Sequence, residues 1–159
     1  MHRSAIFSTC RRYRYLLSRH WDEHLPTLLI IGLNPSTAGA THDDPTIKRC
    51  IGFAQSWGYG SLHVANLFAL MATQPKDLLA DKAPVGQLND RYLRQLIKAC
   101  DRTVVAWGNY GTHLERNLQV LAFIKKPYCL KINKNGQPAH PLYQKADTRL
   151  RAYTWPTKI

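Results

Sequence analysis

The 159-residue sequence predicts an α/β fold: a three-layer α/β/α sandwich with a mostly parallel, four-stranded central sheet. Short apolar runs alternate along the chain with segments of helical periodicity, which is the order of βαβ units. The run Leu28–Ile31 is wholly apolar, as in a central strand that is buried on both faces. The length fits one domain, residues 1–159, whose core is large enough to fold without disulfide bonds.

The N-terminal segment Ile6–Trp21 precedes this sheet, and we expect it to form an edge strand or a hairpin. In it the strand-forming residues Tyr13 and Tyr15 alternate with arginine. The first central strand, Leu28–Ile31, then stops at Gly32–Pro35. Glycine tolerates unusual backbone angles and proline cannot donate to a sheet ladder, so this strand is expected to end in a sharp turn.

Asn34 lies in that turn. Residues at the carboxyl end of a central parallel strand face the crevice where open α/β sheets bind ligands. Asn34 is therefore a candidate functional residue, although an ordinary Asn–Pro turn after a strand explains it equally well.

A helix is expected from Pro45 to Trp57. Asp44 suits its N-cap, Pro45 suits the first helical position, and Gly58 and Gly60 suit its end. Its apolar face is formed by residues at helical spacing: Ile47, Cys50, Ile51, Ala54 and Trp57.

Asn66 interrupts the apolar run of the next expected strand, Ser61–Leu70. A polar amide in a buried strand costs free energy unless it is hydrogen-bonded. Asn66 is therefore expected either to bind a ligand or to tie down a neighbouring loop.

The remaining chain continues the alternation of helices and strands. Gly86–Cys100 has one apolar face and predicts a helix, and Thr103–Trp107 predicts the third strand. Thr112 and Glu115 have the spacing of a capping box before a further helix. The fourth strand is expected at Pro127–Ile132.

Polar or aromatic features follow all four expected strands. They are Asn34, Asn66, Trp107–Gly108 and His140–Pro141. Because the carboxyl ends of parallel strands are neighbours at one edge of a sheet, these residues are expected to meet in one crevice.

Short motifs in this order resemble the uracil-DNA glycosylase superfamily, whose fold is a central four-stranded parallel sheet flanked by helices. The motifs are Gly32–Leu33–Asn34–Pro35, Val64–Ala65–Asn66–Leu67, Ala106–Trp107–Gly108 and His140–Pro141–Leu142. The whole chain more closely resembles a family of small bacterial and phage proteins of unknown function. The segments shared with that family include Asp43–Asp44–Pro45–Thr46, Trp57–Gly58–Tyr59–Gly60 and His140–Pro141–Leu142–Tyr143.

The resemblance to the glycosylases implies a uracil-DNA glycosylase-like fold and a nucleobase that enters the crevice flipped out of its strand. It implies that Asn66 binds the Watson–Crick edge of the base and that Asn34 positions a water near the sugar C1′. His140 would donate to a base oxygen as negative charge develops there. The substrate-binding set would also include residues beside these motifs: Pro35, Ser36 and Trp107.

Asp43, Asp44 and Tyr59 each have two interpretations. Asp44 is explained by the helix N-cap, whereas Asp43 has no such role. Because Asn34 is not ionisable, Asp43 is the candidate catalytic base, and either aspartate is a candidate acid, base or metal ligand. Tyr59, between two glycines, either stacks on a base or packs on the surface.

The net charge of +12 is concentrated at the two ends of the chain. Residues 1–21 carry +5 and residues 125–159 carry +7, whereas the segment between them is neutral. This segregation favours a nucleic acid (DNA above all) or a nucleotide as partner over a merely solvated surface. The candidate phosphate contacts are basic residues of both ends: Arg11, Arg12, Arg14, Lys145, Arg149 and Arg151.

We expect a cytoplasmic protein without a membrane partner, because no apolar run is long enough to cross a bilayer and no secretory signal is present. The four cysteines form no Cys-x-x-Cys pair, so reduced thiols are expected, with no metal site or other cofactor. Three functions stay open: a glycosylase-like hydrolase, a nucleobase- or nucleotide-modifying enzyme on the same scaffold, and a non-catalytic nucleic-acid-binding module.

Overall fold

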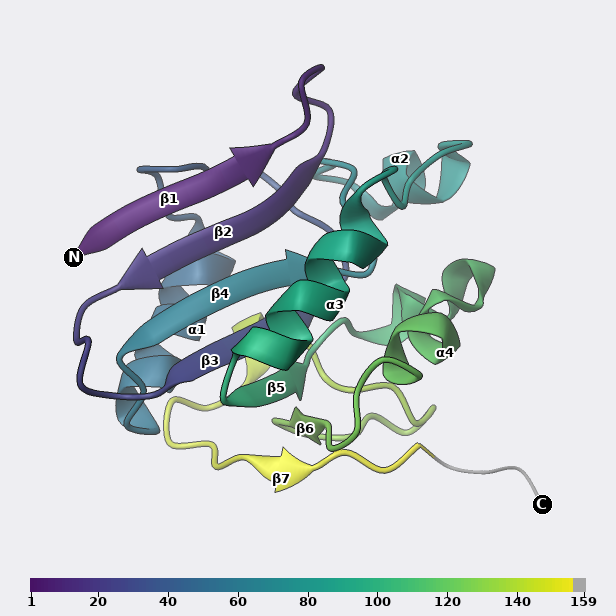
Figure 1. Ribbon diagram of the computed structural model, residues 1–159. Coiled ribbons are helices and arrows are strands. Elements are labelled where there is room, and N and C mark those ends of the chain that lie inside the picture. Colours follow the sequence, from purple (N-terminus) through teal and green to yellow (C-terminus); the bar gives the residue numbers. More distant parts are fainter. Residues whose placement is uncertain (156–159) are drawn as a thin grey trace.

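The computed structural model describes residues 1–155, which form a seven-stranded mixed sheet in the order β1-β2-β4-β3-β5-β6-β7 (Figure 1). The strands are β1 His2–Phe7, β2 Arg14–His20, β3 Thr27–Gly32, β4 Ser61–Asn66, β5 Arg102–Val105, β6 Tyr128–Cys129 and β7 Arg151–Ala152. The helices are α1 Pro45–Ser56, α2 Pro75–Ala80, α3 Asn89–Ala99 and α4 Arg116–Leu121, with 3₁₀ helices η1 Asn109–Glu115 and η2 Pro141–Tyr143.

Parallel pairing joins β4 to β3, β3 to β5 and β5 to β6, so the carboxyl ends of these strands lie at the same edge of the sheet. Antiparallel strands extend the sheet on both sides, with β1 and β2 beyond β4 and β7 beyond β6. The expected four-stranded sheet is therefore corrected to a seven-stranded mixed one. The added β7 has two residues, too few to show a strand periodicity in the sequence.

Side chains of the central strand β3 alternate between two cores. Leu28 and Ile30 pack with residues of α1 on one face of the sheet, and Leu29 and Ile31 pack with residues of α3 and α4 on the other. Figure 1 shows α1 behind the sheet and α3 in front of it. All four side chains are at most 1% exposed, and each such burial contributes roughly 1.5–3 kcal/mol.

The N-terminal segment forms the β1–β2 hairpin, in which β1 is the edge strand and β2 also pairs with β4. Because β2 lies inside the sheet, Arg14 and Arg19 on it are buried, at 2% and 0% exposure. Arg19 donates to Asp43 Oδ1 and to the carbonyl of Gly39, each at 2.8 Å. This arginine therefore holds the loop before α1 against the hairpin.

The strand β4 ends at Asn66, four residues before the end that its apolar run predicts. The N–H groups of Leu67 and Phe68 still donate to the carbonyls of Gly32 and Leu33, and beyond Phe68 the backbone bonds to other segments. The N–H groups of Ala69 and Leu70 donate to the carbonyls of Val85 and Pro84, at 3.0 and 3.1 Å. Non-local backbone bonds thus set this strand boundary.

The capping box expected at residues 112–115 does not form. Leu114 and Glu115 both have φ of 55°, in the left-handed region, so the chain kinks between η1 and α4. The turn before the kink packs tightly, since a Cβ on Gly111 would lie 2.1 Å from Trp107 Cδ1. Across residues 1–155, none of the helices has the length and apolar character needed to span a bilayer.

Candidate functional site

A cavity of about 600 Å³, which we call the strand-end cavity, opens at the carboxyl ends of β3, β4 and β5. Its lining includes Asn34 from the loop after β3, Asn66 at the end of β4 and His140 just before η2. The segments 72–75 and 106–110 and the start of α1 contribute further walls. Three residues that are distant in the sequence therefore line one cavity, because parallel pairing aligns the strand ends.

Asn66 is buried, at 4% exposure, and its Nδ2 has no hydrogen-bond partner within residues 1–155. Leaving a buried amide donor unpaired costs roughly 1–3 kcal/mol. Gly32, the parallel neighbour of Asn66 on β3, gives the side chain its room: a Cβ on Gly32 would lie 2.9 Å from Asn66 Oδ1. The glycine of this motif therefore accommodates the Asn66 amide.

Two buried side chains that the sequence analysis missed hold the end of β4. Asn89 Nδ2 donates to the carbonyls of Asn66 and Leu67, at 2.9 and 3.0 Å. Arg116 Nε donates to the Leu67 carbonyl at 2.8 Å, and its guanidinium also pairs with Asp90. These partners lie 22 to 49 residues from Leu67 in the sequence, so no local pattern indicates them.

Asn34 has a structural role in the cavity wall. Its Nδ2 is surrounded by three carbonyl oxygens, those of Pro35 at 3.1 Å, Leu70 at 3.4 Å and Ala72 at 2.9 Å. These bonds join the loop after β3 to the loop after β4. The amide nitrogen is therefore occupied, and only Oδ1 is left to contact a water or a ligand.

His140 lines the cavity as a neutral imidazole. Its Nδ1 accepts a hydrogen bond from the Leu142 N–H at 3.2 Å, so the ring proton lies on Nε2. Burial lowers the pKa of His140, and the Asp44 carboxylate opposes that shift. The ring centroid lies 5.9 Å from that of Tyr143. His140 thus retains a donor, Nε2–H, for a ligand.

Arg14 lines the cavity and is not the exposed phosphate contact that the sequence predicts. The correction follows from the pairing of β2 with β4, which buries this side chain. One terminal nitrogen, Nη1, donates to the Ala38 carbonyl at 3.0 Å, whereas Nε has no partner within residues 1–155. Burial lowers the pKa of Arg14 to about 10, against the influence of the Asp44 carboxylate, so the guanidinium stays charged at neutral pH.

Asp44 is the one carboxylate among the described residues that line the cavity. It is the N-cap of α1, as predicted: Oδ1 accepts from the Ile47 N–H at 2.9 Å. Such a cap stabilises a helix by about 1 kcal/mol. Its charge also raises the pKa of Arg14 and of His140. Cys50 lies nearby, and burial raises the pKa of its thiol to about 12, so it stays neutral.

Pro35, Ser36 and Trp107, which the resemblance to the glycosylases places in the substrate-binding set, lie in the cavity lining. The Trp107 side chain is 1% exposed, and its Nε1 donates to Gln137 Oε1 at 3.0 Å. Trp107 is therefore a fixed wall, with its indole held in the core.

Two predicted site residues lie outside the cavity lining. The Asp43 carboxylate pairs with the buried Arg19 at 2.8 Å, so it holds a loop and is not a free base at the cavity mouth. Tyr59 is 7% exposed and packs in the core beneath α1, where burial raises its pKa. Tyr59 is therefore not available to stack on a base.

The other predicted phosphate contacts lie on the surface, outside the cavity lining. The Arg11 guanidinium stacks on the Phe7 ring, 4.2 Å from its centroid, and Arg12 pairs with Asp81 at 2.8 Å. Lys145, Arg149 and Arg151 are exposed.

Two exposed tyrosines at the cavity were missed. Tyr110, from η1, and Tyr143, from η2, line it with 48% and 81% of their surface exposed. Tyr143 directly follows the His-Pro-Leu motif, and that adjacency is the signal that could have indicated it. In residues 1–155 no three His, Cys, Asp or Glu side chains are grouped so that they could hold a metal ion.

Comparisons with known proteins assign a family. A search of curated proteins and a search of solved structures found no match to this chain. A family model matches residues 14–142, which run from β2 into η2 and include most of the cavity lining. The family is described as "Protein of unknown function (DUF1643)", and this chain belongs to it.

Proposed function

We propose that this protein binds a nucleobase in the strand-end cavity and hydrolyses the N-glycosidic bond that joins the base to its sugar. The observation that carries the proposal is a pair of buried donors, Asn66 Nδ2 and Arg14 Nε, that have no acceptor within residues 1–155. They lie on residues that line one cavity with His140, whose Nε2–H is a third donor. Buried unpaired donors cost free energy, so they are expected where a ligand supplies the acceptors. The motifs that resemble the uracil-DNA glycosylase superfamily, Gly32–Pro35 and His140–Leu142, support the same conclusion.

The three donors favour a base that presents several acceptors on its edges. The keto oxygens of a uracil-like base, or O6 and N7 of guanine, meet that requirement. The volume of about 600 Å³ lies within the roughly 300–1,000 Å³ of typical ligand sites. Tyr110 and Tyr143, exposed at the cavity, are suited to stack on a base that has left its strand.

In the proposed reaction, a water forms a bond to the sugar C1′ while the C1′–N bond breaks and its electron pair leaves with the base. His140 donates Nε2–H to the base oxygen on which negative charge develops. Asn34 orients the water through Oδ1, because its nitrogen is occupied. The Asp44 carboxylate takes the proton that the water loses, and the departing base takes a proton from solvent.

A second candidate is recognition of the base without cleavage. It is favoured by Asn34, whose amide nitrogen is used for loop closure, and by the pairing of Asp43 with Arg19. These contacts leave Asp44 as the one carboxylate in the lining. In this case the protein either modifies the bound base or nucleotide, using Asp44, or binds it without any reaction.

The test is release of a base from labelled oligonucleotides. Single-stranded and mismatched DNA that contains uracil, hydroxymethyluracil or other modified bases is incubated with the protein, and abasic sites are detected by alkaline cleavage. Asn66→Leu removes the unpaired donor and keeps the branched shape of the side chain. Gln95→Leu, at an exposed position of α3, is the matched control.

Base release by the wild type and by Gln95→Leu, with loss in Asn66→Leu, would support hydrolysis. Binding of free bases that depends on Asn66, with intact oligonucleotides, would replace hydrolysis by the second candidate. If the wild type neither releases nor binds any base, both proposals fail.

A further inference from the structure

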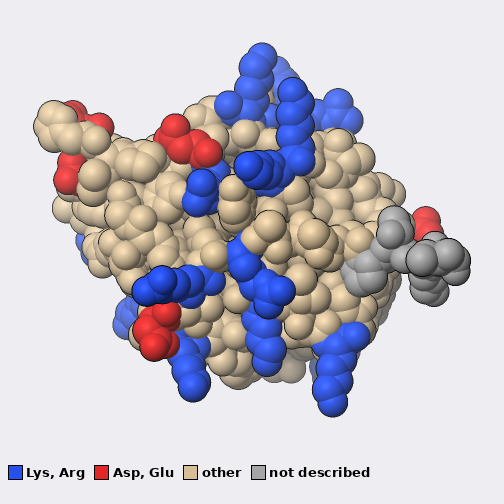
Figure 2. Space-filling view, turned by 90° about the horizontal axis from the view of Figure 1, so that it is seen from below, with Lys and Arg blue, Asp and Glu red and all other residues tan. Residues whose placement is uncertain are grey.

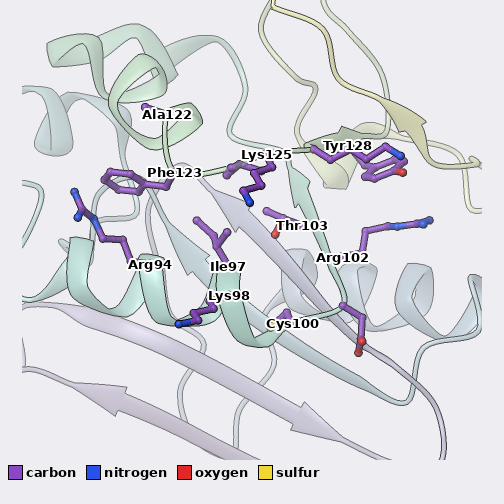
Figure 3. A pocket seen from close by; sticks show the side chains of 13 residues that line it. Arg94, Ile97, Lys98, Cys100, Arg102, Thr103, Ala122, Phe123, Lys125 and Tyr128 are labelled. Carbon is purple, nitrogen blue, oxygen red and sulfur yellow. The ribbon is translucent and has the colours of Figure 1, made fainter.

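A second and larger hollow, of about 990 Å³, lies at the amino ends of β5 and β6, opposite the strand-end cavity (Figure 3). We call it the basic hollow. It is bordered by the C-terminal half of α3, the start of β5 and the segment from the end of α4 to β6. Five cationic side chains line it: Arg94, Lys98, Arg102, Lys125 and Lys126.

These cations are not neutralised by the protein itself. None of the five forms a salt bridge within the part of the chain that the structure describes. Asp101 is the one carboxylate in the described lining, and its Oδ2 already accepts from the Thr27 N–H at 2.8 Å. Like charges gathered in a hollow repel one another and raise the local concentration of anions.

Two of the cations are held against aromatic rings. The Arg94 guanidinium lies 4.4 Å from the centroid of Phe123, and that of Arg102 lies 4.3 Å from the centroid of Tyr128. Stacking on a ring orders each guanidinium, whose N–H groups lie at its edges. Figure 3 shows the two arginines on opposite sides of the hollow, with Lys98 and Lys125 between them. The charges are therefore spread out and do not converge on one point.

We propose that the basic hollow binds the phosphate backbone of a nucleic-acid strand. A single phosphate would require cations that converge, whereas a strand presents a series of phosphates, which suits cations spread over the hollow. Arg151 extends the charge, because β7 pairs with β6 next to Tyr128. On the face seen from the β7 side, Lys and Arg side chains are widely spread and acidic ones are few (Figure 2).

This inference does not depend on the function proposed for the strand-end cavity. The basic hollow lies at the other end of the strands, and among the described residues none lines both sites. A strand held there is retained whether or not a base is bound or cleaved.

The test measures binding of a fluorescently labelled single strand of about 16 nucleotides by anisotropy over a range of salt concentrations. The variant Lys125→Glu/Lys126→Glu reverses two charges of the basic hollow. Lys76→Glu/Lys82→Glu, at exposed positions outside both sites, changes the net charge equally. Lys125→Gln/Lys126→Gln provides a milder pair, and circular dichroism checks that each variant is folded.

We expect the Lys125→Glu/Lys126→Glu variant to lose about tenfold or more in affinity, and the control to lose much less. The slope of the logarithm of the association constant against the logarithm of the salt concentration should become less steep by about 0.7 for each phosphate that the variant no longer neutralises. Equal losses in both charge variants, or no loss in either, would overturn the proposal. Competition by polyglutamate as strong as that by the unlabelled strand would replace nucleic acid by an acidic protein.

Discussion

The two ends of the parallel strands carry cavities of opposite construction. At the carboxyl ends, two polar side chains of the strand-end cavity are buried: Asn66 is 4% exposed and Arg14 is 2% exposed. At the amino ends, the basic hollow is lined by exposed lysines and by arginines stacked on aromatic rings.

This difference indicates how selective each end is expected to be. Fixed, buried donors discriminate strongly between ligands, because a wrong ligand leaves them unpaired. Exposed cations attract any chain of phosphates, and that attraction weakens as salt is added. We therefore expect base identity to be determined at the strand-end cavity, and backbone affinity at the basic hollow.

The largest expected effect is on the free energy of unfolding, when the buried Arg19 that pairs with Asp43 is replaced. Arg19→Met leaves the Asp43 carboxylate and the carbonyls of the loop before α1 without their donor. Removing one partner of a buried ion pair typically costs about 3–5 kcal/mol, and we expect a loss of that size in the free energy of unfolding. Urea denaturation measures it.

The control for that variant is Lys125→Met in the basic hollow, which should change the free energy of unfolding by no more than about 0.5 kcal/mol. If Arg19→Met unfolds at the same urea concentration as the wild type, the loop does not depend on this pair.

A smaller expected effect concerns the free energy of unfolding when either of two buried amides, Asn66 or Asn89, is replaced by leucine. The two changes should have opposite signs if Asn66 binds a ligand and Asn89 holds the fold. Asn66→Leu removes an unpaired donor, so the free energy of unfolding should stay level or rise by about 1 kcal/mol while base binding is lost. Asn89→Leu removes two hydrogen bonds to the backbone at the end of β4, so the free energy of unfolding should fall by roughly 1–3 kcal/mol. Thermal and urea unfolding of both variants provide the comparison. Equal destabilisation would mean that Asn66 is also structural.

The sequence indicates the strand-end cavity better than the basic hollow, and the reason is the topology of the sheet. Asn34 and His140 follow expected strands and Asn66 lies in one, and parallel pairing brings the ends of such strands together without further information. Arg14 could not be placed in this way, because its burial depends on the pairing of β2 with β4. The partner of Asp43 is Arg19, 24 residues earlier, and no local pattern indicates that pair.

The basic hollow was missed for a different reason. Charge counted along the chain gives a neutral middle segment, yet Arg94, Lys98 and Arg102 from that segment meet Lys125 and Lys126 in space. Of the nine acidic residues in that segment, Asp101 alone is in the described lining of the hollow. Asp43 pairs with Arg19, for example, on the other side of the sheet's centre.

The smallest effect uses pH to distinguish the two ends. The pKa of His140 is lowered in the folded protein by burial, against the influence of Asp44, and the ring also lies near Tyr143. The unfolded chain therefore binds a proton more readily, near the ordinary histidine pKa of about 6.5. The stability that the neutral ring contributes is present above that value, and it is lost as pH falls towards the folded pKa.

Replacing the ring by His140→Gln should make the free energy of unfolding fall less steeply between about pH 7 and pH 5. Burial also lowers the pKa of His63, which is present in both proteins, so the difference between their slopes isolates His140. Strand binding at the basic hollow should change little over the same range, because none of its described lining residues is a histidine. Urea denaturation at several pH values measures the first effect and anisotropy the second. Identical slopes with and without His140 would show that its burial does not contribute to the pH dependence of stability. A steep pH dependence of strand binding would show that a titrating group affects the basic hollow as well.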